Sequence, residues 1–275
     1  MLRRSHVWQV ALLGLVIGCG EITKSDNTSR KATSTSTETT AAIEQPDLEA
    51  VPVEEPSSKN AAARAKDVFA SLIKIAESRS GDVATWSKLE SELHELGLAA
   101  VPALAERLSD PNNVARELSA MFLAQLGPDA SPATEGLLKL LDDDSTFARV
   151  NAAAALSTFD GHAERVTTVL TALLADDDVN VRITAATSLR NVGPSGSEAV
   201  GALSRSLRDT DSRVRAAAAT TLGELGKLAS PSLTTLRKLD DDEDEQVRTA
   251  ATRAIKRIDE TARTAPVTIP ASATE

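Results

Sequence analysis

The 275-residue chain is long enough for one or two domains, and 41% of its residues are hydrophobic while only 2% are aromatic. Leu and Ala must therefore supply most of the packing, which favours close helix–helix contact over a β-sandwich or an aromatic-lined pocket. The formal net charge of −10 argues against binding to a phosphate backbone, which depends on clustered Lys and Arg.

The first segment, residues 1–18, has the pattern of an export signal. Two arginines precede an apolar stretch of about eleven residues, too short to span a bilayer as a mature helix. The stretch ends in Val16, Ile17, Gly18 and Cys19, which resembles the lipobox of bacterial lipoproteins. That resemblance implies cleavage before Cys19 and its acylation, for example with palmitate. We then expect a lipid-anchored protein of the cell envelope, on the extracytoplasmic (periplasmic or cell-surface) side of a bacterial membrane. An ordinary secretory signal with an incidental cysteine, or a short uncleaved anchor, is the alternative.

Two segments of low apolar periodicity flank the central part of the chain. Residues 19–60 are rich in Ser, Thr, Pro and Glu, which predicts a disordered tether that spans about 35 Å on average. Residues 259–275 predict a second disordered tail. Between them, residues 61–96 contain two amphipathic stretches, which we interpret as a degenerate repeat that caps one end of the domain.

Residues 97–258 contain a repeat with a period of 33 residues. An arginine recurs at this period, with an aspartate six residues before it, a leucine twelve before it, and a leucine or isoleucine seven after it. The aspartate–arginine pairs are Asp110 and Arg116, Asp143 and Arg149, Asp176 and Arg182, Asp209 and Arg215, and Asp242 and Arg248. A fixed period over five units indicates a solenoid.

Each unit has the pattern of two helices. The first carries apolar residues three and four apart, and in two units the sequence Ser-Pro (Ser131-Pro132, Ser230-Pro231) predicts its start. Good N-cap residues stand four positions before each arginine, and glycines predict where the second helices end. The N-cap candidates are Asn112, Ser145, Asp178, Asp211 and Asp244, and the glycines are Gly127, Gly161, Gly193 and Gly226.

These motifs resemble the HEAT repeat family, particularly the short bacterial type related to phycobilisome-lyase HEAT-like repeats. The resemblance implies an all-α fold, a right-handed α-solenoid of HEAT-like helix pairs, with five repeats in residues 97–258. It also implies that the aspartates and arginines form a structural ladder of hydrogen bonds between neighbouring repeats. The first two units depart from the pattern, because Ala115 and Ala148 replace the aliphatic residue before the arginine.

Candidate chemistry is sparse. HEAT-repeat di-iron hydroxylases hold their metals through several His-Glu pairs, and this chain has one such pair, His94-Glu95. The acidic turns at 142–144, 176–178 and 240–242 could bind calcium weakly, but they lack a glycine-shaped coordinating loop, and helix capping explains them. A bilin-lyase activity fits poorly with export, and the repeats have 18 Lys and Arg against 23 Asp and Glu, which disfavours nucleic acid.

We therefore predict a monomeric, non-enzymatic protein–protein interaction scaffold that has no cofactor, metal or nucleic-acid partner and contacts a membrane through its lipid anchor only. Its protein partner is unknown. The second helices are expected to line a concave partner-binding surface through Met121, Val150, Ile183, Thr187, Arg190, Thr220 and Glu224. A lyase-like or metal-dependent HEAT-repeat enzyme is the alternative.

Overall fold

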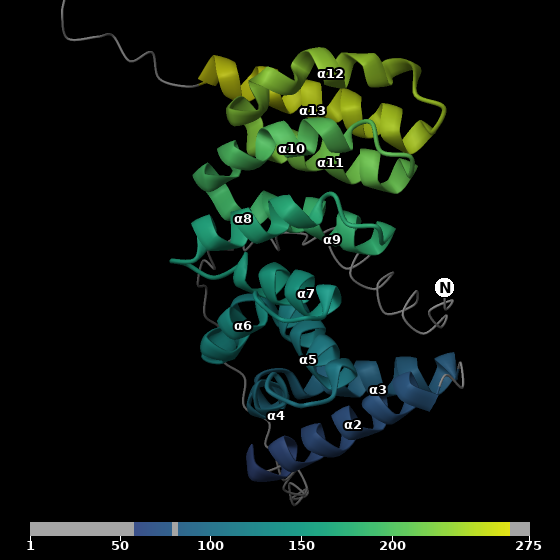
Figure 1. Ribbon diagram of the computed structural model, residues 1–275, viewed down its shortest axis with the longest axis vertical. Coiled ribbons are helices and arrows are strands. Elements are labelled where there is room, and N and C mark those ends of the chain that lie inside the picture. Colours follow the sequence, from purple (N-terminus) through teal and green to yellow (C-terminus); the bar gives the residue numbers. More distant parts are fainter. Residues whose placement is uncertain (1–57, 79–81, 265–275) are drawn as a thin grey trace, which may run out of the picture.

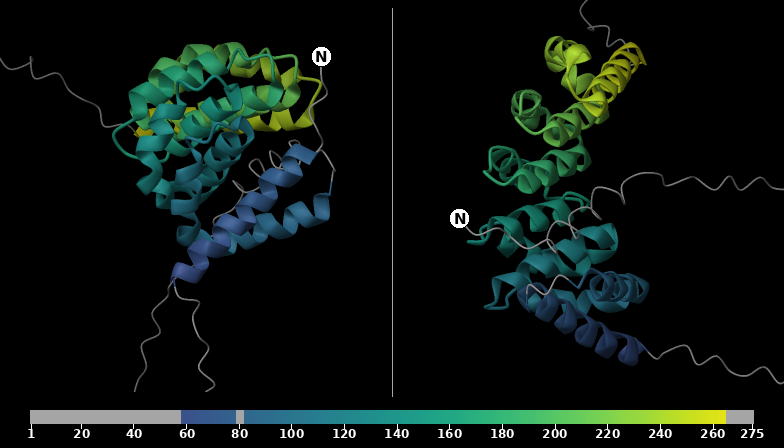
Figure 2. Two further views of the ribbon diagram at one scale, coloured as in Figure 1. Left: turned by 60° about the horizontal axis from the view of Figure 1, so that its bottom comes forward. Right: turned by 90° about the vertical axis from the view of Figure 1, so that its right-hand side faces the viewer.

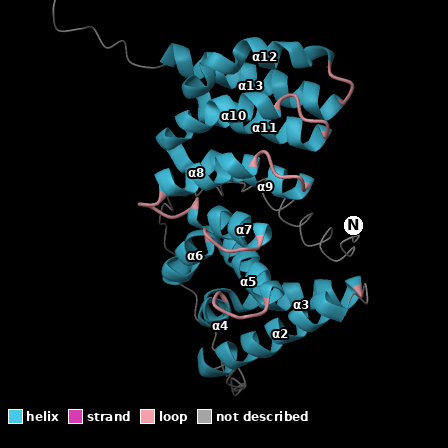
Figure 3. Cartoon of the chain, in the orientation of Figure 1, coloured by secondary structure: helices cyan, strands magenta, loops and turns pink. Residues whose placement is uncertain are grey.

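The computed structural model describes residues 58–78 and 82–264, in which every regular element is an α-helix or a 3-10 helix (Figures 1 and 3). Helix pairs are stacked along the long axis, from α2 and α3 at one end to α12 and α13 at the other. The all-α solenoid predicted from the 33-residue period is confirmed. The expected signal segment, Cys19 and the tether up to residue 57 lie outside the described residues.

Two layers of helices make up the stack (Figure 2). The first helices of the five repeats are α4 (Val101–Arg107), α6 (Thr134–Leu140), α8 (Ala163–Leu173), α10 (Val200–Ser206) and α12 (Leu233–Arg237). The second helices are α5 (Asn113–Leu126), α7 (Thr146–Leu156), α9 (Val179–Ser188), α11 (Ser212–Leu225) and α13 (Glu245–Thr264). The 3-10 segments are η1 (Gly97–Ala100), η2 (Gly127–Ala133), η3 (Leu189–Ala199), η4 (Gly226–Ser232) and η5 (Lys238–Asp241).

The repeated leucine columns form a continuous core. The leucines twelve residues before each arginine are all 0% exposed, and so are the four leucines seven residues after it. Ile255, which continues the second column in the last repeat, is half-buried. These columns are Leu104, Leu137, Leu170, Leu203 and Leu236, and Leu123, Leu156, Leu189 and Leu222. Because each side chain fills the space between two layers and two repeats, the period of the sequence sets the period of the packing.

The N-terminal pair α2 (Ser58–Ser78) and α3 (Val83–Leu96) covers the open end of the core. Asp82 caps α3 by accepting a hydrogen bond from the amide of Thr85. Phe69 of α2 packs edge-to-face on Phe122 of α5, with ring centroids 6.1 Å apart, and Trp86 is 1% exposed. Large aromatic side chains thus pack the junction between the cap and the first repeat.

The predicted N-caps of the second helices are present in all five repeats. For example, the Asp211 carboxylate accepts the amide of Arg213 at 2.9 Å, and Asp244 accepts the amide of Gln246 at 2.8 Å. The glycines are placed only partly as expected. Helices α5 and α11 end directly before Gly127 and Gly226, which adopt positive φ.

Helices α7 and α9 end earlier than predicted, at Leu156 and Ser188. The amides of Thr158 and Phe159 bond to carbonyls three residues back, so the chain tightens before it reaches Gly161. The Ser-Pro steps do not open the first helices either. They lie inside η2 and η4, and the Ser230 hydroxyl donates to the carbonyl of Lys227 instead of capping α12.

Both predicted boundaries of disorder need correction. Helix α2 begins at Ser58, inside the expected tether, and α13 continues to Thr264, inside the expected tail. The extension of α13 has a packing reason, because Thr261 lies directly over Gly226 of η4. A Cβ atom on Gly226 would be 2.9 Å from the Thr261 hydroxyl oxygen. The final turns of α13 therefore cover the preceding repeat.

Candidate functional site

The aspartates and arginines that recur every 33 residues form a ladder of hydrogen bonds near the start of the second helices. Arg182 donates from Nε and Nη2 to both carboxylate oxygens of Asp209, at 2.8 and 2.9 Å. Its Nη1 donates to the carbonyl oxygen of Asp176 at 2.8 Å. Arg182 therefore joins the turn of its own repeat to the turn of the next one.

The carboxylate partner comes from the following repeat, 27 residues downstream, whereas the aspartate six residues upstream supplies its backbone carbonyl. Arg116 binds Asp143 and Arg215 binds Asp242 in the same bidentate way. The hydrogen bond from Arg215 holds the pKa of Asp242 below its usual value, against the opposing effect of burial. Bidentate guanidinium–carboxylate pairs are strong and directional, which suits a structural role.

The ladder is interrupted at the junction between α7 and α9. Arg149 donates to the carbonyls of Asp143 and Asp144 and to the hydroxyl of Thr146, and between the described residues Arg149 and Asp176 no hydrogen bond forms. The turn before the third repeat is also irregular. Gly161, with φ of 89°, stands one residue later than the register of Gly127, Gly193 and Gly226, whose φ values are 54–60°.

Three of the predicted partner-binding residues are buried, which contradicts that part of the hypothesis. Met121 is 0% exposed, Val150 1% and Ile183 7%. Met121 and Val150 belong to the continuous core, because α5 and α7 pack directly against each other. Thr187 and Arg190 are half-buried, and the Thr187 hydroxyl donates to carbonyls of its own helix.

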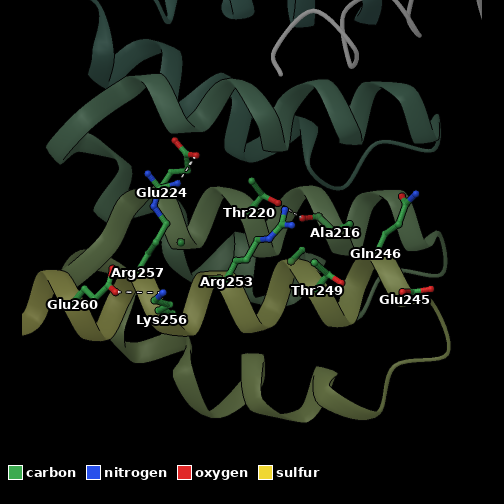
Figure 4. A pocket seen from close by; sticks show the side chains of 13 residues that line it. Ala216, Thr220, Glu224, Glu245, Gln246, Thr249, Arg253, Lys256, Arg257 and Glu260 are labelled. Carbon is green, nitrogen blue, oxygen red and sulfur yellow. Dashed lines mark hydrogen bonds and ion pairs between the residues drawn. The ribbon is translucent and has the colours of Figure 1, made fainter. Parts of the chain in front are cut away.

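The remaining two residues, Thr220 and Glu224, are exposed and line a groove between α11 and α13 (Figure 4). The groove has a volume of about 860 Å³. Its lining consists of Ala216, Thr220, Gly223 and Glu224 from α11, and Glu245, Gln246, Thr249, Ala250, Arg253, Ala254, Lys256, Arg257 and Glu260 from α13. Small residues allow the two helices to approach closely, since a Cβ on Gly223 would be 2.7 Å from the Cα of Ala254.

Charged side chains are distributed unevenly along this groove. Arg257 donates to Glu224 at 2.8 Å, and Lys256 lies 3.9 Å from Glu260. Arg253 occupies the middle of the groove, and its side chain points toward Thr220 (Figure 4). Within the described part of the chain, no carboxylate forms an ion pair with Arg253.

The sequence reasoning missed most of the α13 side of the groove. Thr249 and Arg253 stand one and five residues after Arg248, which are the positions used to choose Ile183, Thr187 and their equivalents. Continuing those columns into the last repeat would have found them. Both side chains are exposed.

Residues 58–78 and 82–264 contain no group of three or more His, Cys, Asp or Glu side chains arranged to hold a metal ion. Over the same ranges, no helix combines the length and apolar character that a bilayer span requires.

The fold is similar to that of several solved structures. An engineered protein of known crystal structure superposes with a TM-score of 0.52 at 24% identity, covering 71% of this chain and 97% of that one. A computationally designed armadillo repeat protein for modular peptide recognition gives 0.50 at 18% identity, covering 74% and 95%. The complex of CpcE and CpcF of phycocyanin lyase from Nostoc sp. PCC7120 gives 0.43 at 27% identity, covering 57% and 98%.

No curated protein matches the chain significantly. The sequence profile of HEAT repeats matches twice, over residues 101–190 and 166–256. Together the two matches extend over residues 101–256, which is more than half of the 275 residues. The chain therefore belongs to the HEAT repeat family.

Proposed function

We propose that this HEAT-repeat protein is a non-enzymatic interaction scaffold that binds a protein partner in the groove between α11 and α13. The observation that carries the proposal is the groove itself, which is open and is lined mainly by exposed polar and charged side chains from two adjacent second helices. Three of the five repeated arginines bind the aspartate of the next repeat, so these pairs serve the architecture. A designed armadillo repeat protein of related fold is described as made for modular peptide recognition, so such a solenoid can present a binding surface.

The proposal includes a lipid anchor on Cys19, which is supported by the lipobox-like sequence ahead of it. Residues 19–57 would then place the solenoid at a distance from an extracytoplasmic membrane surface, with the anchor as the protein's contact with lipid. The acidic balance of the repeats supports a protein partner over a nucleic acid. In this proposal the protein is a monomer.

Site-specific photo-crosslinking in cells that express the full chain tests the groove. A photoreactive residue replaces Thr220 or Thr249, and the matched control replaces Thr234, an exposed threonine on the first-helix layer. We expect a discrete adduct of the same mass from Thr220 and Thr249 and none from Thr234. Equal adducts from all three positions, or adducts from Thr234 alone, would refute the groove as the binding surface.

A further inference from the structure

Two charged residues of α13 stand in the groove without partners of opposite charge. Lys256 and Arg257 each have a nearby glutamate, but in the described residues no ion pair includes Arg253 or Glu245. Figure 4 shows Arg253 in the middle of the groove and Glu245 at its end. The groove therefore presents one unpaired cation and one unpaired anion to whatever occupies it.

The distance between Arg253 and Glu245 along α13 matches the spacing of side chains on an extended peptide. Arg253 follows Glu245 by eight residues, which is about 12 Å along an α-helix. An extended peptide advances about 3.3 Å per residue and places every second side chain on the same face. Two side chains four positions apart on such a peptide lie about 13 Å apart on one face, which matches the separation along α13.

The surface between the two charges suits a peptide backbone. Ala216 and Ala250 are small and leave room for the chain to approach. The Thr220 hydroxyl donates to the carbonyl of Ala216 at 2.9 Å, so its remaining capacity is to accept a hydrogen bond from a peptide N–H. Gln246, exposed between Glu245 and Thr249, can both donate to a peptide carbonyl and accept from a peptide amide.

We infer that the groove binds an extended peptide segment in which one acidic and one basic side chain stand four positions apart, the acidic one facing Arg253 and the basic one facing Glu245. This inference rests on the proposed function and specifies its partner class. The lining of α13 from Glu245 to Glu260 is about 22 Å long, enough for six or seven extended residues.

Synthetic peptides with neutral ends and a neutral fluorophore test the spacing directly. The sequence TETVTKT has the acid and base four positions apart, and TTTEKVT has the same composition with the two charges adjacent. Fluorescence anisotropy at low salt with the full chain should show TETVTKT binding about tenfold more tightly, as expected for two ion pairs on a partly desolvated surface. Equal affinities of the two peptides would overturn the inference.

Reversing the charge of Arg253 distinguishes a specific ion pair with the acidic side chain of the peptide from a general electrostatic attraction. Arg253→Glu should abolish the preference for TETVTKT and create a preference for TKTVTKT, which carries two basic residues. Arg263→Glu makes the same charge change at an exposed position of α13 outside the groove lining and should leave the preference unchanged. If both variants changed binding equally, the inferred pairing would be wrong.

The crosslinking experiment distinguishes failure of this inference from failure of the proposed function. If adducts form at Thr220 and Thr249 but TETVTKT does not bind, the groove is still the partner-binding surface, and the inferred peptide class is wrong. Binding of TETVTKT that is lost in Arg253→Glu supports the inference.

Discussion

The ladder predicts that the arginines of successive repeats contribute unequally to stability. Arg182 makes a bidentate contact with Asp209, and the two side chains are 13% and 12% exposed. Arg149, its equivalent one repeat earlier, bonds only to neutral oxygens of its own repeat. Replacing each arginine by alanine compares a junction that has the bridge with one that lacks it.

The structure gives the magnitude of the difference. Arg182→Ala removes two hydrogen bonds to the Asp209 carboxylate and those to the carbonyls of Asp176 and Asp177. It leaves the Asp209 carboxylate with the amide of Asp211 as its remaining donor. A net value of about 1.5–3 kcal/mol applies to hydrogen bonds with charged groups, and loss of a buried partner adds to it. We expect a loss of about 2–3 kcal/mol for Arg182→Ala and about 1 kcal/mol for Arg149→Ala.

Urea unfolding followed by circular dichroism at 222 nm measures these losses. Arg213→Ala is the control, because Arg213 pairs with Asp211 on the surface at 57% exposure and should cost less than about 0.5 kcal/mol. A double-mutant cycle of Arg182→Ala with Asp209→Asn should give a coupling energy of about 1–2 kcal/mol. Coupling below about 0.5 kcal/mol, or equal losses for Arg182→Ala and Arg149→Ala, would refute the ladder as a source of inter-repeat stability.

Three further predictions concern pH, packing and the anchor. Arg215 lowers the folded-state pKa of Asp242, so the stabilisation from this carboxylate is present above its unfolded pKa of about 3.9 and is lost as the pH falls through the folded value. Asp242→Asn should therefore destabilise the protein less at pH 2.5 than at pH 7, in urea melts at both pH values. Gly223→Ala should cost about 1–3 kcal/mol because its Cβ would meet the backbone of α13 at 2.7 Å, whereas Gly201→Ala, which enters open space in α10, should gain about 0.5–1 kcal/mol in the same assay. Cys19→Ser should abolish incorporation of radioactive palmitate into the full chain, and label that survives the substitution would contradict the anchor.

The 33-residue period predicts which residues occupy the same position in successive repeats. This is sufficient to predict which residues form the core. Leu170 and Leu203 stand at the same position of successive units and are both 0% exposed. The N-caps could be predicted for the same reason, since capping depends on residues within one turn of the helix. These features are local or strictly periodic, so one sequence contains what determines them.

Exposure on the second-helix face could not be predicted in this way. Met121 and Thr220 occupy the same column, five residues after the arginine, yet Met121 is 0% exposed and Thr220 is exposed. Exposure depends on how the neighbouring helices pack over each position, which the period does not contain. The aspartate whose carboxylate binds a given arginine also depends on how successive repeats pack, because that aspartate belongs to the next repeat.

The interruption at Arg149 did have a signal in the sequence. The 33-residue register places a glycine at position 160, where the chain has Asp160, and Gly161 follows one residue later. This shift occurs in the turn after α7, at the one junction between the described repeats where the bidentate bridge is absent. A one-residue change in a turn alters the direction in which the next helix starts, and the period alone cannot give that direction.

The groove lies in the part of the stack where the ladder is continuous, and this position favours a rigid binding surface. Near the start of α11, Arg215 binds Asp242 in the turn before α13. Near the end of α11, Glu224 accepts a hydrogen bond from Arg257, and between these two points the α11 backbone at Gly223 approaches α13 closely. The separation of α11 and α13 is therefore fixed at both ends and in between. A surface whose helices are already held apart at a fixed distance loses little conformational entropy on binding, so more of the contact energy is available for affinity.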